Sequence, residues 1–154
     1  MHPKCCRGFT LIEVIASITI MSILATVMLT RMTVATPFSE RGYADGITAS
    51  LRQARSVALA SGCAVQFTIS AAGYSAFQHG PGANNHCAAA GAWSTPVRRG
   101  NGQDLIESQP AGVVLAANRQ FVFAADGSVA GGPVTINVGP QAITIDASGV
   151  VQGP

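Results

Sequence analysis

The hydrophobic and polar positions divide the chain into stretches of different periodicity, and the first is a long apolar run. From Phe9 to Thr30 the sequence has no glycine, no proline and a single charge, that of Glu13. As a helix rising about 1.5 Å per residue, this run would be about 33 Å long, enough to cross a hydrocarbon core of about 30 Å. Lys4 and Arg7 precede it, so the positive-inside rule places the N-terminus in the cytoplasm and the rest of the chain beyond the membrane.

A second helix is predicted from Ser39 to Ser61, because apolar residues recur there at steps of four, four, three and four. This single face consists of Tyr43, Ile47, Leu51, Ala54 and Ala58. Pro37 disfavours helix in the residue before it, which indicates a kink or a restart between the two helical stretches. Gly42 and Gly46 each weaken the helix by about 1 kcal/mol relative to alanine, so we expect a local bend near them.

Beyond Gly62 the period changes to two, which is typical of strands with one buried face. The predicted strands are Ala64–Ser70, Tyr74–Gln78, Trp93–Val97, Gly112–Ala116, Arg119–Ala124, Val134–Val138 and Ala142–Asp146. The stretch from Gln78 to Asp104 is rich in glycine, asparagine and proline, and we interpret it as a long exposed loop interrupted by the Trp93 strand. Short strands joined by tight turns after a long helix indicate an α+β domain.

Composition narrows the classes of function. Hydrophobic residues make up 48% of the chain and charged residues only 10%, with a net charge of +2. Without Lys4 and Arg7, seven arginines balance seven acidic residues, so bulk charge indicates neither a disordered charged tail nor a large basic surface for nucleic acid.

Cys63 and Cys87 are the two cysteines of the predicted folded domain, since Cys5 and Cys6 precede the apolar run. Outside the cytoplasmic membrane they are expected to form a disulfide worth about 3 kcal/mol; the alternative is two buried free thiols. A zinc site combining them with His79 and His86 is the weaker interpretation, because the paired spacing of zinc ligands is missing. We therefore predict no metal and no cofactor.

The N-terminal stretch also admits a cleaved secretory signal peptide, with a small-residue site near Thr33-Val34-Ala35. The apolar run is longer than the usual hydrophobic region of about 7 to 15 residues, and Glu13 would oppose insertion at mid-membrane. We favour a retained anchor. Glu13 then either finds a partner inside the membrane or reaches the nearby interface.

Gly8-Phe9-Thr10-Leu11-Ile12-Glu13, between a basic leader and the apolar run, resembles the class III signal of type IV prepilins and type II secretion pseudopilins. The resemblance implies that a prepilin peptidase cuts between Gly8 and Phe9 and methylates the new amine of Phe9. It also implies that Glu13 pairs with the N-terminus of a neighbouring subunit during filament assembly.

Three further segments resemble the GspH/FimT family of minor pilins and pseudopilins, and they occur in the order expected behind such a signal. They are Leu51–Arg55 leading to Ala60-Ser61-Gly62, Phe121–Ser128, and Ile143–Gly149. The implied fold is a long N-terminal helix, half transmembrane and half amphipathic, packed on antiparallel β-sheets.

Catalytic motifs are missing from the sequence. It has no nucleophile elbow, phosphate-binding glycine loop or metalloprotease helix, and Asp104 with Glu107 is interpreted as solvated surface rather than as a catalytic pair. We therefore expect no enzyme; a membrane-tethered periplasmic enzyme is the weaker alternative. Arg98 and Arg99, joined by Arg119, would be the phosphate contacts of a DNA-binding pilin for uptake, but the neutral domain makes nucleic acid an unlikely partner.

The sequence thus predicts residues 1–8 as a cleaved leader, 9–30 as a transmembrane assembly segment, 31–62 as an amphipathic helix and 63–154 as a periplasmic β-rich domain. The function predicted is that of a non-catalytic subunit of an inner-membrane pilus or pseudopilus that serves assembly and protein secretion. Its expected partners are other pilins, the prepilin peptidase and the inner-membrane assembly platform. No residue indicates which machine it serves among a type II secretion system, a type IV pilus and a mannose-sensitive haemagglutinin-type pilus.

Overall fold

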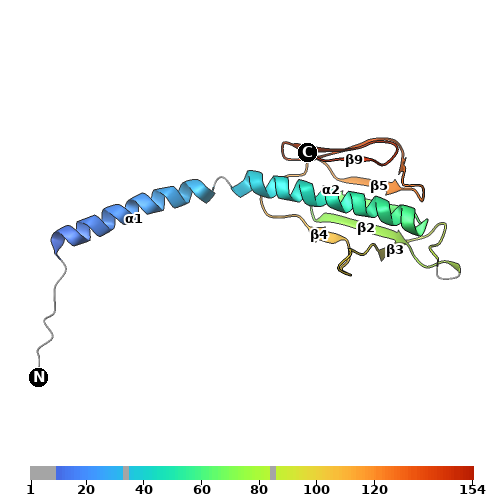
Figure 1. Cartoon of the computed structure of the whole chain (residues 1–154), viewed down its shortest axis with the longest axis horizontal. Coiled ribbons are helices and arrows are strands. Elements are labelled where there is room, and N and C mark those ends of the chain that lie inside the picture. Colours follow the sequence, from blue (N-terminus) through green and yellow to red (C-terminus); the bar gives the residue numbers. More distant parts are fainter. Residues whose placement is uncertain (1–9, 33–34, 84–85) are drawn as a thin grey trace, which may run out of the picture. The chain divides into compact units, whose positions relative to one another are not determined.

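The structure is a computed structural model that describes residues 10–32, 35–83 and 86–154. The chain forms two compact units, one ending at Ala35 and the other comprising Thr36–Pro154. The described part of the first unit is the helix α1, Leu11–Met32. Helices precede all the strands along the described chain (Figure 1).

The second unit begins with the helix α2, Ala35–Ser61, and continues with strands only. Pro37 is the third residue of α2, within the first turn, where its missing N–H group removes no helical hydrogen bond. The helix continues through Gly42 and Gly46 without interruption, so the bend expected there does not break it. It ends at Ser61, and the next residue, Gly62, has a φ of 65°, the left-handed conformation that terminates helices.

Two antiparallel sheets follow α2. The strands are β1 Val65–Ser70, β2 Gly73–His79, β3 Trp93–Pro96, β4 Ile106–Ser108, β5 Arg119–Phe123, β6 Val129–Ala130, β7 Val134–Val138, β8 Gln141–Ile145 and β9 Val151–Gln152. The larger sheet has the order β3-β2-β1-β5-β6, with β4 also paired to β2, and the smaller sheet has the order β7-β8-β9. The α+β class predicted from the sequence is confirmed.

The apolar face of α2 packs on both sheets and forms one core. Tyr43, Ile47, Leu51, Ala54 and Ala58, the stripe predicted from the sequence, are all buried. In β1 buried and half-buried residues alternate, as the period of two predicts. The same core includes aromatic side chains of β1 and β5 and isoleucines of β7 and β8, and α2 overlies strands of both sheets in Figure 1.

Six of the seven predicted strands are observed with ends within one residue of the prediction, but Gly112–Ala116 is wrong. A turn in which Val113 N–H donates to the Pro110 carbonyl occupies its first residues. What remains makes an isolated bridge between Leu115 and Val138, too short for a strand. The stretch from Gln78 to Asp104 is also more ordered than expected, with bridges between Pro81 and Cys87 and between Arg98 and Asp104 flanking β3.

Candidate functional site

Helix α1 carries the described part of the predicted N-terminal motif. Gly8 and Phe9, the predicted cleavage and methylation residues, lie outside the described residues. Glu13 lies in the first turn of α1, where the positive end of the helix dipole favours a carboxylate, and its side chain is exposed. The backbone N–H of Glu13 donates to the Thr10 carbonyl at 3.0 Å. Glu13 is therefore oriented by the start of the helix and available to a partner.

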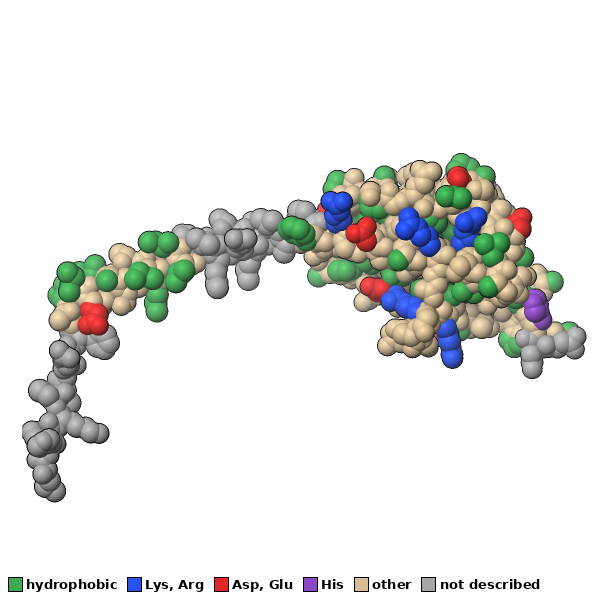
Figure 2. Space-filling view, viewed as in Figure 1, with side chains coloured by type: hydrophobic (Ala, Val, Ile, Leu, Met, Phe, Trp, Pro, Cys, Tyr) green, Lys and Arg blue, Asp and Glu red, His purple; other side chains and the backbone are tan. Residues whose placement is uncertain are grey.

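From Leu11 to Leu24 the large apolar side chains of α1 are exposed (Figure 2). Those with large exposed fractions include Leu11 at 77%, Ile12 at 76% and Met21 at 73%. Within residues 10–32, 35–83 and 86–154, no helix combines the length and the apolar character needed to cross a membrane.

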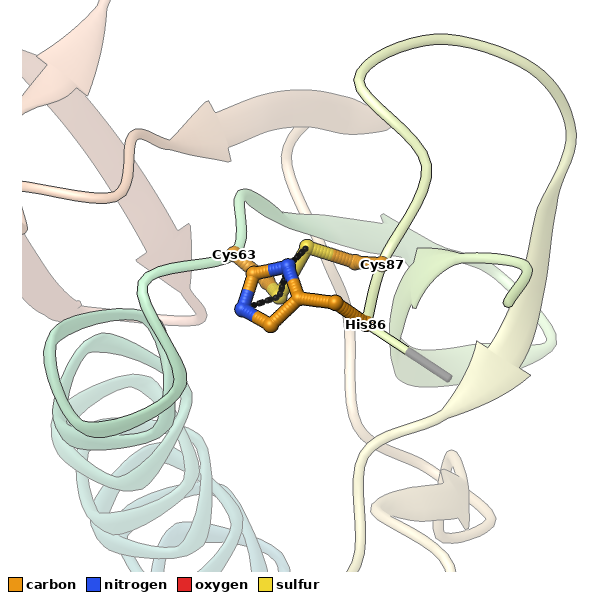
Figure 3. A group of neighbouring side chains, drawn as sticks. All are labelled: Cys63, His86 and Cys87. Atoms are coloured by element: carbon orange, nitrogen blue, oxygen red, sulfur yellow. Dashed lines mark hydrogen bonds between the residues drawn. A yellow bond between two sulfur atoms is a disulfide. The ribbon is translucent and has the colours of Figure 1, made fainter. Parts of the chain in front are cut away.

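A disulfide joins Cys63, just after α2, to Cys87 in the hairpin between β2 and β3, so the predicted pairing is confirmed. Figure 3 shows His86 beside this bond. Its Nδ1 lies 3.4 Å from Cys87 Sγ and 3.9 Å from Cys63 Sγ. Among the described residues, Cys63, His86 and Cys87 form a group whose potential metal-binding atoms all lie within 4.8 Å of one another.

The imidazole of His86 is oriented by the end of α2. Its Nε2 is 3.1 Å from the carbonyl oxygen of Ser61, so Nε2 carries the proton and donates it to this acceptor. In the neutral imidazole the lone pair is then on Nδ1, whose nearer sulfur is that of Cys87. His86 is exposed, and its contact with the disulfide has one signal in the sequence, that His86 is the direct neighbour of Cys87.

A second polar group connects α2 with the edge of the larger sheet. The Tyr74 hydroxyl donates to Glu107 Oε2 at 2.6 Å and lies 3.0 Å from Ser50 Oγ, which donates to it. Arg99 contributes an ion pair with Glu107 at 2.6 Å. The Tyr74 hydrogen bond and then Arg99 hold the pKa of Glu107 below its ordinary value. Tyr74 and Arg99 thus hold Glu107 in its anionic form.

Two arginines of α2 bind the smaller sheet and one turn of each sheet. Arg52 donates to the Val151 carbonyl, and Arg55 donates to the carbonyls of Gly127 and Ser148 at 3.2 and 3.1 Å. These arginines line a pocket of about 250 Å³. Because their donors are engaged with backbone carbonyls, they act as clamps between helix and sheet.

The arginines considered as DNA contacts are only partly brought together. Arg98 lies 3.8 Å from Asp104 and Arg99 pairs with Glu107, so both are near carboxylates. Arg119 begins β5, and β2 and β1 lie between β5 and β3 in the sheet order. This pairing with carboxylates reduces the positive potential that phosphates would meet.

Comparison with known families shows to which family the chain belongs. A family model for the prokaryotic N-terminal methylation motif matches residues 3–29, and a model for the type II transport protein GspH matches residues 43–149. No curated protein and no solved structure gives a match. The GspH match covers more than half of the chain and spans α2 and the two sheets just described, and the chain therefore belongs to the GspH family of type II transport proteins, as a GspH-like pseudopilin or minor pilin.

Proposed function

We propose that this chain is a non-catalytic filament subunit that is processed at the membrane and then assembled into a type IV pilus or a type II secretion pseudopilus. The observation that carries the proposal is the order of two family matches, a methylation motif at residues 3–29 followed by a GspH match at residues 43–149. A processing signal joined to a domain without a catalytic motif is typical of a subunit rather than of an enzyme.

In this function the segment 9–30 anchors the subunit in the inner membrane, and residues 37–154 lie in the periplasm. A prepilin peptidase removes residues 1–8 and methylates the amine of Phe9. Glu13 then pairs with the positively charged N-terminus of a neighbouring subunit. The exposed position of its side chain in the first turn of α1 supports this role, because a carboxylate that is moved out of water needs an opposite charge.

Intact mass of the protein purified from membranes tests the processing step. A chain that begins at Phe9 and carries one methyl group is expected. A mature chain that begins near Thr36 would show that a secretory signal peptide had been removed, and the anchor proposal would then be abandoned.

Variants of Glu13 test assembly separately from processing. Glu13→Val is expected to be inserted and cleaved normally but to be lost from filaments isolated with the partner pilins. Ser17→Val, one turn further along α1, is the matched control for added apolar bulk and should assemble. Normal incorporation of Glu13→Val would refute the charge-pairing role.

A further inference from the structure

The disulfide between Cys63 and Cys87 lies beside the imidazole of His86, which the disulfide does not need in order to form. Nδ1 of His86 lies 3.4 Å from Cys87 Sγ, the two ring nitrogens lie 3.8 and 3.9 Å from Cys63 Sγ, and Nε2 is held by the Ser61 carbonyl. A histidine that binds a metal through one nitrogen usually donates the other N–H to a carbonyl or a carboxylate, which fixes the ring. His86 has this arrangement, with the two sulfurs in the place of the other ligands.

We propose that Cys63, His86 and Cys87 form a redox-controlled binding site for a zinc-type divalent cation. A dithiol reductant gives two electrons to the disulfide and becomes a disulfide itself, and Cys63 and Cys87 become thiols. When the cation binds, the two thiols release their protons to water and act as thiolates, and the oxidation state of the metal does not change. Thiolate and imidazole ligands select a cation of the zinc class over magnesium or calcium.

The distances agree with this chemistry. Zinc binds sulfur at about 2.3 Å and nitrogen at about 2.0 Å, so ligand atoms of a tetrahedral site lie about 3.5 to 4 Å apart. The separations of His86 Nδ1 from the two sulfurs are close to this range, whereas the sulfurs themselves, bonded to each other in the disulfide, have to separate after reduction. Water completes the coordination from the adjoining pocket of about 500 Å³, which Gln78, His79 and Thr95 help to line.

The hairpin that carries two of the ligands is held together by its backbone as well as by the disulfide. Gly82 N–H donates to the His86 carbonyl, and Ala88 N–H donates to the Gly80 carbonyl at 2.9 Å. A Cβ atom on Gly82 would come within 2.9 Å of Ala88 Cα, so the close approach of the two hairpin arms depends on glycine there. Because these bonds do not involve the sulfur atoms, reduction does not remove them directly, and we expect the thiols to stay near each other.

On the other side, the end of α2 fixes Cys63. The Ser61 hydroxyl donates to the Val57 carbonyl and accepts the N–H of Cys63 at 3.2 Å and the amide of Gln78 at 2.8 Å. The cation would thus replace the covalent bond by a coordinate one between the helix end and the hairpin. The helix end and the hairpin would then be linked in both redox states, by the disulfide or by the cation.

The test is a metal titration of the full-length chain in detergent, with Cys5→Ser and Cys6→Ser to remove the leader thiols. After reduction by a dithiol and its removal without oxygen, Co²⁺ should produce a thiolate-to-cobalt absorption band at one equivalent, and Zn²⁺ should displace it. The oxidised protein should give no band. Equal binding by the oxidised protein, or no band after reduction, would overturn the proposal.

Two histidine variants assign the third ligand. His86→Gln keeps the disulfide, so the folding of this variant can be checked by the fluorescence of Trp93 before reduction. After reduction the variant should bind Co²⁺ at least about tenfold more weakly, since losing a residue that only supports a metal ligand already weakens binding by about that factor. His79→Gln changes a histidine that lines the same pocket but is outside the ligand group, and should bind as the parent does. The reverse result would show that His86 is not a ligand.

Discussion

Removal of the hydroxyl group is expected to change stability in opposite directions at the two tyrosines of the domain, although both are buried. Tyr43 in α2 and Tyr74 in β2 are both buried, and their ring centroids are 5.8 Å apart. The Tyr74 hydroxyl contacts Ser50, Glu107 and Arg99. The Tyr43 hydroxyl is buried and has no hydrogen-bond partner among the described residues. Burial, followed by the nearby Tyr74 and Glu107, raises the pKa of Tyr43 to about 12, so this phenol is neutral at ordinary pH.

The magnitudes follow from what each substitution leaves behind. Tyr43→Phe removes a hydroxyl that was desolvated without compensation, a group that costs about 1 to 3 kcal/mol, so the variant should be about 1 kcal/mol more stable. Tyr74→Phe removes a hydrogen bond to a carboxylate and leaves the buried Ser50 hydroxyl without its acceptor. Its loss should be about 2 kcal/mol, within the usual range of about 1.5 to 3 for a hydrogen bond to a charged group.

Urea unfolding of the full chain in detergent, followed by the fluorescence of its single tryptophan, Trp93, measures both variants. The midpoint should rise for Tyr43→Phe and fall for Tyr74→Phe with an unchanged slope, because neither change alters the area exposed on unfolding. Ser50→Ala is the control that removes the donor to Tyr74 without changing a ring. A loss of stability in Tyr43→Phe equal to that in Tyr74→Phe would show that the Tyr43 hydroxyl is satisfied in solution, and the reasoning would fail.

Three other predictions concern the contacts that join the elements of the domain. Tyr74 and Arg99 lower the pKa of Glu107, so the stability that this carboxylate contributes is present above its ordinary pKa of 4.5 and is lost as the pH falls below that value. Glu107→Gln should therefore make the free energy of unfolding depend less on pH between about pH 6 and pH 3. Replacing Cys63 and Cys87 by alanine, which opens a loop with a sequence separation of 24, should lower the free energy of unfolding in urea by about 3.5 kcal/mol. An unchanged midpoint would show that the disulfide does not stabilise the domain. Arg55→Ala, which loses bonds to the Gly127 and Ser148 carbonyls, should cost about 1 to 2 kcal/mol by thermal unfolding, whereas Arg41→Ala on the exposed side of α2 should cost almost nothing.

Periodicity predicted the elements that bury a regular face. The α2 stripe from Tyr43 to Ala58 and the alternation in β1 are both set by contact with one continuous core, so the apolar positions alone define them. Strands without that signal were missed. Only one residue of β6 and one of β9 is buried, and all of β4 is exposed. These strands form because neighbouring strands provide partners for their backbone hydrogen bonds, and the local pattern of apolar residues does not indicate such partners.

Gly112–Ala116 shows the converse error. Val113 is buried and Leu115 packs against the core, so the segment has the alternation of a strand. Its backbone, however, is committed first to a turn at Pro110 and then to single bonds with the end of β7 and the residue after it. Alternating side-chain burial therefore does not guarantee a ladder in this domain, just as the exposed β4 forms a ladder without it.

The two sites of this protein differ in how far sequence could reveal them, and the difference is physical. The N-terminal methylation motif, matched at residues 3–29, is encoded in consecutive residues, so the sequence alone was enough to predict it. The arrangement of Cys63, His86 and Cys87 is produced by the end of a helix and the register of a hairpin, through bonds such as that from Gly82 to His86. The spacing rule for zinc ligands assumes that each ligand pair lies on one local turn. Here one pair is adjacent in sequence and the third ligand comes from 23 residues earlier, so the rule was bound to reject a group that the fold brings together.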